Sequence, residues 1–152
     1  MQHIKYLLLV FIPLSLILSC TRELPRSPRE AFAETSRAVQ NGDAERFYDL
    51  ISDESKKELT DTVKSINSMP EKQRTELEKK DILYTKGIVE EKEFLSAWIK
   101  KERTTNPMLI SLSRTILMID ENNGKAKVRL DNGIELLFEK EGLYWKLSLK
   151  GK

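Results

Sequence analysis

The hydrophobic positions of this chain change their period near residue 107. From residue 27 to about residue 103 they recur every three or four residues, as on one face of a helix, whereas later they alternate. The first part therefore predicts helices, and the second predicts strands joined by short turns. This order is typical of an α+β domain whose N-terminal helices pack on one face of a C-terminal antiparallel sheet.

The first two helices have clear start and stop signals. The motif SPRE at 27–30 offers a serine N-cap, a proline in the first turn and a glutamate that completes a capping box. Asn41-Gly42 ends this helix, and Asp43 caps a shorter one that carries Phe47. The predicted core face of the first helix consists of Ala31, Phe32, Thr35, Ala38 and Val39.

Further helices follow, with one irregular segment between them. A third helix is expected from about Asp53, and SMPE at 68–71 repeats the serine and proline start signal for a fourth. Seven of the residues in 71–80 are charged, which indicates a solvated helix face. Residues 81–89 are expected to form a short strand or an extended crossing, and another helix is expected over 90–103.

Asn106-Pro107 is expected to end the last helix, and four strands then form a meander. The strands are predicted at 110–119, 125–130, 134–139 and 143–149. A crossing segment that paired with them would make the sheet five-stranded.

The turn after Leu130 decides the register of the second hairpin. A two-residue loop would place Leu130 opposite Glu135, so an apolar and a charged side chain would share one face. A three-residue loop with Gly133 in the left-handed conformation avoids this and is preferred. It pairs Leu130 with Ile134, Val128 with Leu136 and Ala126 with Phe138 inside, and Arg129 with Glu135 and Lys125 with Glu139 outside.

The first strand has apolar residues on both faces. Ile116 and Met118 alternate with Leu117 and Ile119. Part of the outer face is therefore expected to be covered, either by a helix or by a second copy of the chain.

An apolar run precedes the domain. Lys5 is followed by Tyr6 to Leu18, which contains no charge, and then by Ser19 and Cys20. Positive, apolar and small residues in this order are typical of a secretory signal. The run is shorter than the roughly 20 residues that a membrane-spanning helix needs, and Pro13 interrupts it.

Ile17-Leu18-Ser19-Cys20 resembles the lipobox of bacterial lipoproteins. The resemblance implies that Cys20 receives a diacylglyceryl thioether and that the chain is cut just before it. The expected organisation is a signal peptide at 1–19, a lipidated cysteine with a short linker at 20–27 and one α+β domain at 28–152. An ordinary signal peptide with a leftover cysteine and a buried structural cysteine remain as alternatives.

This resemblance also predicts the location of the protein. It implies attachment to the bacterial cell envelope through lipid at Cys20, so the membrane is the first expected partner. Thr21 stands where many lipoproteins retained at the inner membrane have aspartate. The outer membrane is therefore the favoured destination.

The charge and the rarity of histidine and cysteine exclude several classes of function. The chain has 26 Lys and Arg against 24 Asp and Glu, without the clustered basic excess that nucleic-acid binding requires. Its one histidine, His3, would leave with the signal. Histidine-dependent triads, Cys-His nucleophiles and His/Cys zinc sites are thereby excluded, and no cofactor or metal is expected.

SPREAFAETSRAVQNGDAERFYDLIS (27–52) and VRLDNGIELLFEKEGLYWKLSL (128–149) resemble the nuclear-transport-factor-two-like, or cystatin-like α+β cone, superfamily. The middle of the chain, 53–107, departs from that pattern by being more helical and more charged. The resemblance implies a cone-like fold with a pocket between the concave sheet face and the first helices. The aromatic residues available to line this pocket are Tyr48, Tyr84, Trp98, Phe138 and Trp145.

Three functions follow from this reading. The favoured one is a non-enzymatic envelope lipoprotein that binds an apolar small ligand or an envelope partner through the sheet–helix pocket. The second is an isomerase- or dehydratase-type enzyme with Asp and Tyr as acid–base groups, since some members of the superfamily have such activities. The third is a structural or surface-interaction module. The Asp and Tyr residues available to the enzyme are Tyr48, Asp49, Asp81, Tyr84 and Tyr144.

Overall fold

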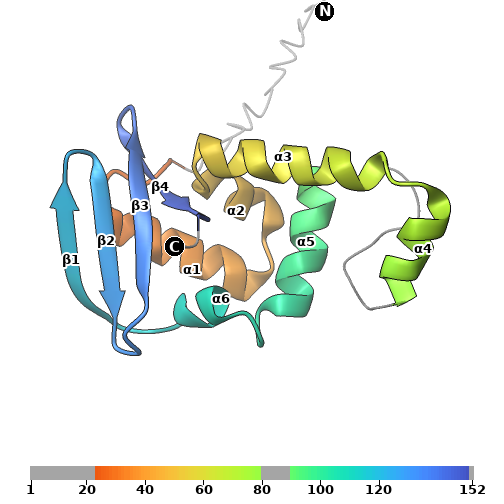
Figure 1. Ribbon diagram of the computed structural model, residues 1–152. Coiled ribbons are helices and arrows are strands. Elements are labelled where there is room, and N and C mark those ends of the chain that lie inside the picture. Colours follow the sequence, from red (N-terminus) through yellow and green to blue (C-terminus); the bar gives the residue numbers. More distant parts are fainter. Residues whose placement is uncertain (1–22, 80–89, 151–152) are drawn as a thin grey trace, which may run out of the picture.

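The computed structural model describes residues 23–79 and 90–150, and it has the α+β architecture expected from the sequence. In this part of the chain, the helices are α1 (Pro28–Asn41), α2 (Ala44–Leu50), α3 (Asp53–Asn67), α4 (Glu71–Lys79), α5 (Glu91–Glu102) and α6 (Pro107–Ser111) (Figure 1). The strands are β1 (Ile116–Asn122), β2 (Lys125–Leu130), β3 (Glu135–Glu141) and β4 (Tyr144–Ser148).

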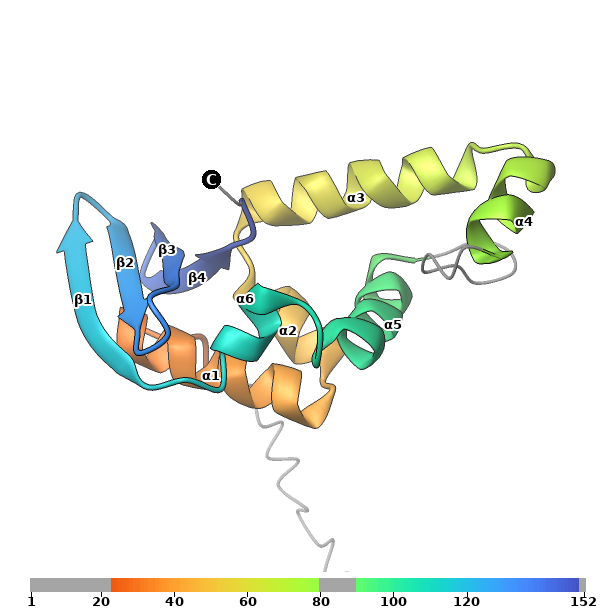
Figure 2. The ribbon, with the colours of Figure 1, turned by 60° about the horizontal axis from the view of Figure 1, so that its bottom comes forward.

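The strands form an antiparallel meander in the order β1-β2-β3-β4. α1 packs on α2 and β4, and α5 packs on α2 and α3. In Figure 2 the sheet stands at one end of the molecule and α4 at the other, with α3 running between them.

The predicted register of the second hairpin is confirmed. Val128 pairs with Leu136 and Ala126 with Phe138. The backbone N–H of Leu130 donates to the Ile134 carbonyl at 3.0 Å. Gly133 has φ +80°, a left-handed conformation that glycine adopts readily because it has no Cβ. One face of the sheet is consequently apolar, and it packs against the helices.

The predicted core face of α1, its N-cap at Ser27 and its end at Gly42 are confirmed, but the predicted capping box is altered, because the Glu30 carboxylate accepts from the N–H of Arg26, one residue before the N-cap. The Glu30 N–H donates to Ser27 Oγ at 3.2 Å, whereas the Glu30 carboxylate accepts from the Arg26 N–H at 2.9 Å. Gly42 has φ +67° at the helix end, and its N–H donates to the carbonyls of Ala38 and Val39. The buried residues of α1 are Pro28, Ala31, Phe32, Thr35, Ala38 and Val39.

The outer edge of β4 is occupied by segments distant in sequence. The Trp145 N–H donates to the Pro25 carbonyl at 2.9 Å, and the Ser52 N–H donates to the Leu147 carbonyl at 2.9 Å. The Leu149 N–H, just beyond the strand, donates to Ser55 Oγ at 2.8 Å. These bonds satisfy backbone groups that an edge strand would otherwise leave unpaired.

The crossing segment 81–89, proposed as a fifth strand, lies outside the described residues.

The predicted strand over 110–119 is wrong in its first half, because residues 110 and 111 belong to α6, a turn follows and β1 begins only at Ile116. Asn106 Oδ1 accepts from the N–H groups of Met108 and Leu109, and Pro107 occupies the first turn. Asn106-Pro107 therefore starts α6 and does not end α5, whose last residue is Glu102. Leu109 and Leu112, spaced by one turn, are buried in the core.

Two smaller expectations need correction. Ser68 does not cap α4, because it is the C-cap of α3 and its hydroxyl donates to the Lys64 carbonyl at 2.8 Å. No helix of the described residues covers the outer apolar residues of β1, since Leu117 is 66% exposed and Met118 45%; cover by a second copy stays a prediction. A register shift between Ile116 and Met118 interrupts the alternation there.

Two leucines of the β3–β4 hairpin, Leu143 in the turn and Leu147 within β4, allow a direct test of this packing. Leu147 is fully buried and Leu143 is 68% exposed. Leu147→Ala should lower the free energy of unfolding by about 2–5 kcal/mol, because it leaves a cavity in the core. The matched substitution Leu143→Ala should change it by no more than about 0.5 kcal/mol. Urea unfolding measures both, and equal losses would contradict the assigned packing.

Candidate functional site

The aromatic residues expected to line a sheet–helix pocket fill the core instead. Phe138 is fully buried and Trp145 is 2% exposed. The ring centroid of Trp98, which is half-buried, lies 6.2 Å from that of Phe47. Tyr48 and Trp98, both half-buried, also pack against the core, and Tyr84 lies outside the described residues.

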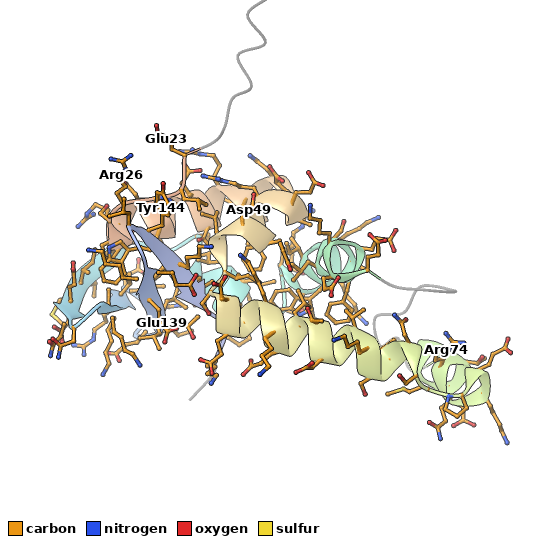
Figure 3. The ribbon with its side chains drawn as sticks, turned by 90° about the horizontal axis from the view of Figure 1, so that it is seen from above. Glu23, Arg26, Asp49, Arg74, Glu139 and Tyr144 are labelled. Atoms are coloured by element: carbon orange, nitrogen blue, oxygen red, sulfur yellow. The ribbon has the colours of Figure 1, made fainter. Side chains whose placement is uncertain are left out.

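The candidate acid–base residues do not converge among the described residues. Tyr48 is half-buried, and Lys56 Nζ lies 5.3 Å from its ring centroid. Asp49 is exposed, and Figure 3 places it on α2, apart from Tyr144 on the last hairpin. Asp81 lies in the segment that the structure does not describe. Neither groove described below is lined by Tyr48, Asp49 or Tyr144.

A small apolar cleft opens where α6 meets the ends of β3 and β4. Its volume is about 220 Å³. Ser148 lines it, and the buried Ser148 Oγ has no hydrogen-bond partner among the described residues. Its other lining residues are Met108, Lys127, Ile134, Glu135, Leu136, Leu137, Leu149 and Lys150.

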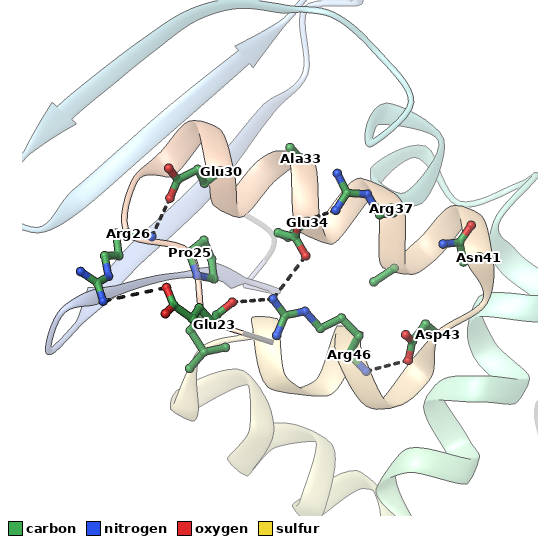
Figure 4. A pocket seen from close by; sticks show the side chains of 12 residues that line it. Glu23, Pro25, Arg26, Glu30, Ala33, Glu34, Arg37, Asn41, Asp43 and Arg46 are labelled. Atoms are coloured by element: carbon green, nitrogen blue, oxygen red, sulfur yellow. Dashed lines mark hydrogen bonds and ion pairs between the residues drawn. The ribbon is translucent and has the colours of Figure 1, made fainter. Parts of the chain in front are cut away.

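A larger groove of about 760 Å³ lies on the outer side of α1 (Figure 4). One wall is residues 23–26, which we call the N-terminal strap; α1 and α2 form the others. The lining is strongly charged and of mixed sign. It consists of Glu23, Leu24, Pro25, Arg26, Glu30, Ala33, Glu34, Arg37, Ala38, Asn41, Asp43 and Arg46.

Arg46 holds the strap to the helices. Its side chain is 6% exposed, and its Nη2 donates to the Glu23 carbonyl at 2.8 Å and to Glu34 Oε2 at 3.2 Å. The other oxygen of Glu34 accepts from Arg37 Nη1 at 2.5 Å. A buried guanidinium that bonds both a carbonyl and a carboxylate is a strong, directional tie.

The strap is also part of the fold along its length. Leu24 packs against the core, and Pro25 is buried while its carbonyl accepts from Trp145. The sequence prediction assigned residues 20–27 to a linker, but residues 23–26 lie on the domain. The available signal was the pair Leu24-Pro25, apolar within a polar stretch.

A second charged cluster covers the other face of β4. Lys146 is 8% exposed, and its Nζ lies 3.7 Å from Glu141 Oε2. Burial lowers the pKa of Lys146 from its ordinary value of 10.5, the nearby Lys56 lowers it further, and Glu141 and Asp53 oppose this. Glu141 Oε1 also accepts from the Asp53 N–H at 2.7 Å. Sequence reasoning missed this cluster, because alternation placed Lys146 on an outer face.

The described residues contain no group of three or more His, Cys, Asp and Glu side chains placed to hold a metal ion. Within the same residues, no helix combines the length and apolar character that crossing a bilayer requires. No family model, curated protein or solved structure matches this chain.

Loss of the Arg46 tie should loosen the strap. Arg46→Met should lower the free energy of unfolding by about 1–3 kcal/mol, because Glu34 and the Glu23 carbonyl lose a charged donor. Trypsin should then cleave after Arg26 faster than in the unchanged protein. Arg37→Met is the control, since the Arg37 side chain is 65% exposed and should alter neither quantity appreciably. Unchanged cleavage in Arg46→Met would contradict the role of this tie.

The lowered pKa of Lys146 has a consequence for stability at alkaline pH. As pH rises from the folded-state pKa toward 10.5, the folded protein loses a proton that the unfolded chain retains, so stability should rise. The slope from this group is at most about 1.4 kcal/mol per pH unit. In urea unfolding, the free energy of unfolding of the unchanged protein should therefore rise relative to that of Lys146→Met as pH approaches 10.5.

Lys150 provides the control, because its pKa is shifted in the opposite direction to that of Lys146. It is exposed, and its bond to Glu54 raises its pKa above 10.5. The stability that this bond contributes is present below 10.5 and disappears as pH rises through the raised pKa. Lys150→Met should therefore not reproduce the alkaline trend of Lys146→Met. Identical pH profiles for the two variants would contradict the assignment to Lys146.

Proposed function

We propose that this chain is a bacterial envelope lipoprotein, anchored by lipid at Cys20, whose α+β domain has a binding role rather than a catalytic one. The observation that carries the proposal is the motif Ile17-Leu18-Ser19-Cys20 at the end of an uncharged apolar run. Cys20 is the chain's only cysteine, so an intrachain disulfide has no second thiol.

The geometry of the described domain favours a partner molecule over an enclosed ligand. The sheet–helix interface is occupied by Phe47, Phe138 and Trp145, which are buried. The apolar cleft beside α6, about 220 Å³, is smaller than the roughly 300–1,000 Å³ of typical ligand pockets. It suits a short apolar group better than a whole lipid-sized ligand. We therefore propose another envelope component as the partner.

The enzymatic alternative has less support. It requires an aspartate and a tyrosine that reach one cavity. Asp49 is exposed, while Tyr48 lies under Lys56. Tyr144 lines neither groove, and Asp81 and Tyr84 are outside the described residues, so the alternative rests on those two.

Labelling tests the anchor directly. Cells that express the protein and receive radiolabelled palmitate should label it, and Cys20→Ala should abolish the labelling because it removes the acceptor sulfur. Ser19→Ala keeps a small residue before the cysteine and should preserve the label. Continued labelling of Cys20→Ala would refute the proposal, whereas loss in both variants would indicate a failure of export or expression that immunoblotting detects.

A further inference from the structure

We propose that the N-terminal strap and the tip of the β3–β4 hairpin form the membrane-facing surface of the domain, with Leu143 inserted among the lipid headgroups. This inference rests on the proposed lipid anchor at Cys20. It adds an orientation of the folded domain, which an anchor alone does not specify. The occupant of the surface is the bilayer itself.

The length of chain between the anchor and the fold limits how far the domain can move away. Thr21 and Arg22 alone separate Cys20 from Glu23, the first residue of the strap. At about 3.3–3.6 Å per residue, Glu23 lies no more than about 11 Å from Cys20. The headgroup layer itself is about 5–8 Å thick on each side of the bilayer. The strap is therefore held at the surface of the headgroup layer.

The strap is hydrogen-bonded to the β3–β4 hairpin, so the hairpin is also close to the anchor. The Trp145 N–H donates to the Pro25 carbonyl at 2.9 Å, so the start of β4 lies directly beside the strap. Figure 3 shows Glu23, Arg26 and Tyr144 together at one end of the molecule and Arg74 at the other. Because Leu143 precedes Tyr144, the hairpin tip faces the same side as the anchored end.

The hairpin tip is built to expose an apolar side chain. Glu141 pairs with Tyr144, which leaves Gly142 and Leu143 as a two-residue turn. Gly142 has φ +62°, which matches the first central position of a type II′ turn. Leu143 is 68% exposed, whereas most large apolar residues of the described chain are buried. An exposed leucine at a projecting tip is suited to the interface of a bilayer.

Cationic side chains flank the tip. Arg26, in the strap, is 67% exposed, and Lys140, two residues before Gly142, is also exposed, with its Nζ 5.9 Å from the ring centroid of Trp145. Long basic side chains can extend toward lipid phosphates while their stems stay on apolar surface. Glu23 and Glu30 lie close to Arg26, so the short tether and Leu143, rather than net charge, are the main determinants of the contact.

Leu117 provides a matched control for Leu143. It is the same residue type and is 66% exposed. It lies near the start of β1, and Leu143 follows the end of β3. Because strands in a meander alternate in direction, these positions are at opposite ends of the sheet. A membrane that contacts Leu143 therefore leaves Leu117 in water.

The experiment places one polarity-sensitive fluorophore at each leucine in turn. Leu143→Cys and Leu117→Cys are made in the full chain, labelled with a thiol-reactive nitrobenzoxadiazole probe and reconstituted into vesicles of phosphatidylethanolamine and phosphatidylglycerol. The sulfur of a lipidated Cys20 is a thioether and does not react. The mass of the purified protein is measured separately to establish lipidation. Lipids brominated near the headgroup serve as short-range quenchers.

The proposal predicts a blue shift and strong bromine quenching for the probe at 143, with neither effect at 117. Lipidated protein in which both probes report water, or both report lipid equally, would overturn the membrane face while leaving the anchor intact. Shielding of the 143 probe without bromine quenching would indicate a protein contact and would also overturn it. A mass without the lipid would overturn the anchor and, with it, this orientation.

Discussion

The arrangement of the domain depends on β4, because this strand is hydrogen-bonded along both edges. β3 occupies one edge. On the other edge, the Trp145 N–H of β4 donates to the Pro25 carbonyl of the strap. The Leu147 carbonyl of β4 accepts from the N–H of Ser52, the N-cap of α3. The last strand of the meander is therefore internal in three dimensions, and the two ends of the described chain are joined through it.

Burial on both faces of β4 follows from this position. Trp145 and Leu147 pack toward α1 and α2, as alternation requires, while Lys146 and Ser148 are covered on the opposite side. A buried ammonium group loses hydration, which is costly unless a carboxylate lies nearby. Glu141 lies beside Lys146 and also accepts the first free N–H of α3, from Asp53. One carboxylate thus serves both the lysine and the helix start, which links the charge of β4 to the placement of α3.

The parts of the fold that sequence could predict are those set by local physical rules. Caps at Ser27 and Asp43 and the left-handed Gly133 each depend on a few neighbouring residues, and the structure has them where predicted. Alternation correctly placed Val128 and Phe138 in the core. The prediction that Asn106-Pro107 ends a helix is wrong, because Asn and Pro are also helix-start signals and here they begin α6, after α5 has ended at Glu102.

The features that could not be predicted from the sequence depend on contacts between residues far apart along the chain. Lys146 is an outer-face residue by parity, yet it is buried beside Asp53 and Lys56 of α3, which are about ninety residues away in sequence. Arg46 looks like an ordinary surface cation on a short helix, yet it bonds the Glu23 carbonyl twenty-three residues away. The predicted pocket failed to appear around Phe138 and Trp145 for a related reason: the large side chains of the helices and the sheet fill the space between them.

The integration of the strap into the fold changes what a lipid at Cys20 would do. A flexible linker would let the domain rotate freely, so any face could meet the membrane. Here Arg46, Glu30 and Trp145 fix the backbone from residue 23 onward. Detaching the strap would remove Leu24 from the core and leave the Trp145 N–H without its acceptor. The same contacts that complete the β4 edge therefore restrict the orientations open to an anchored domain.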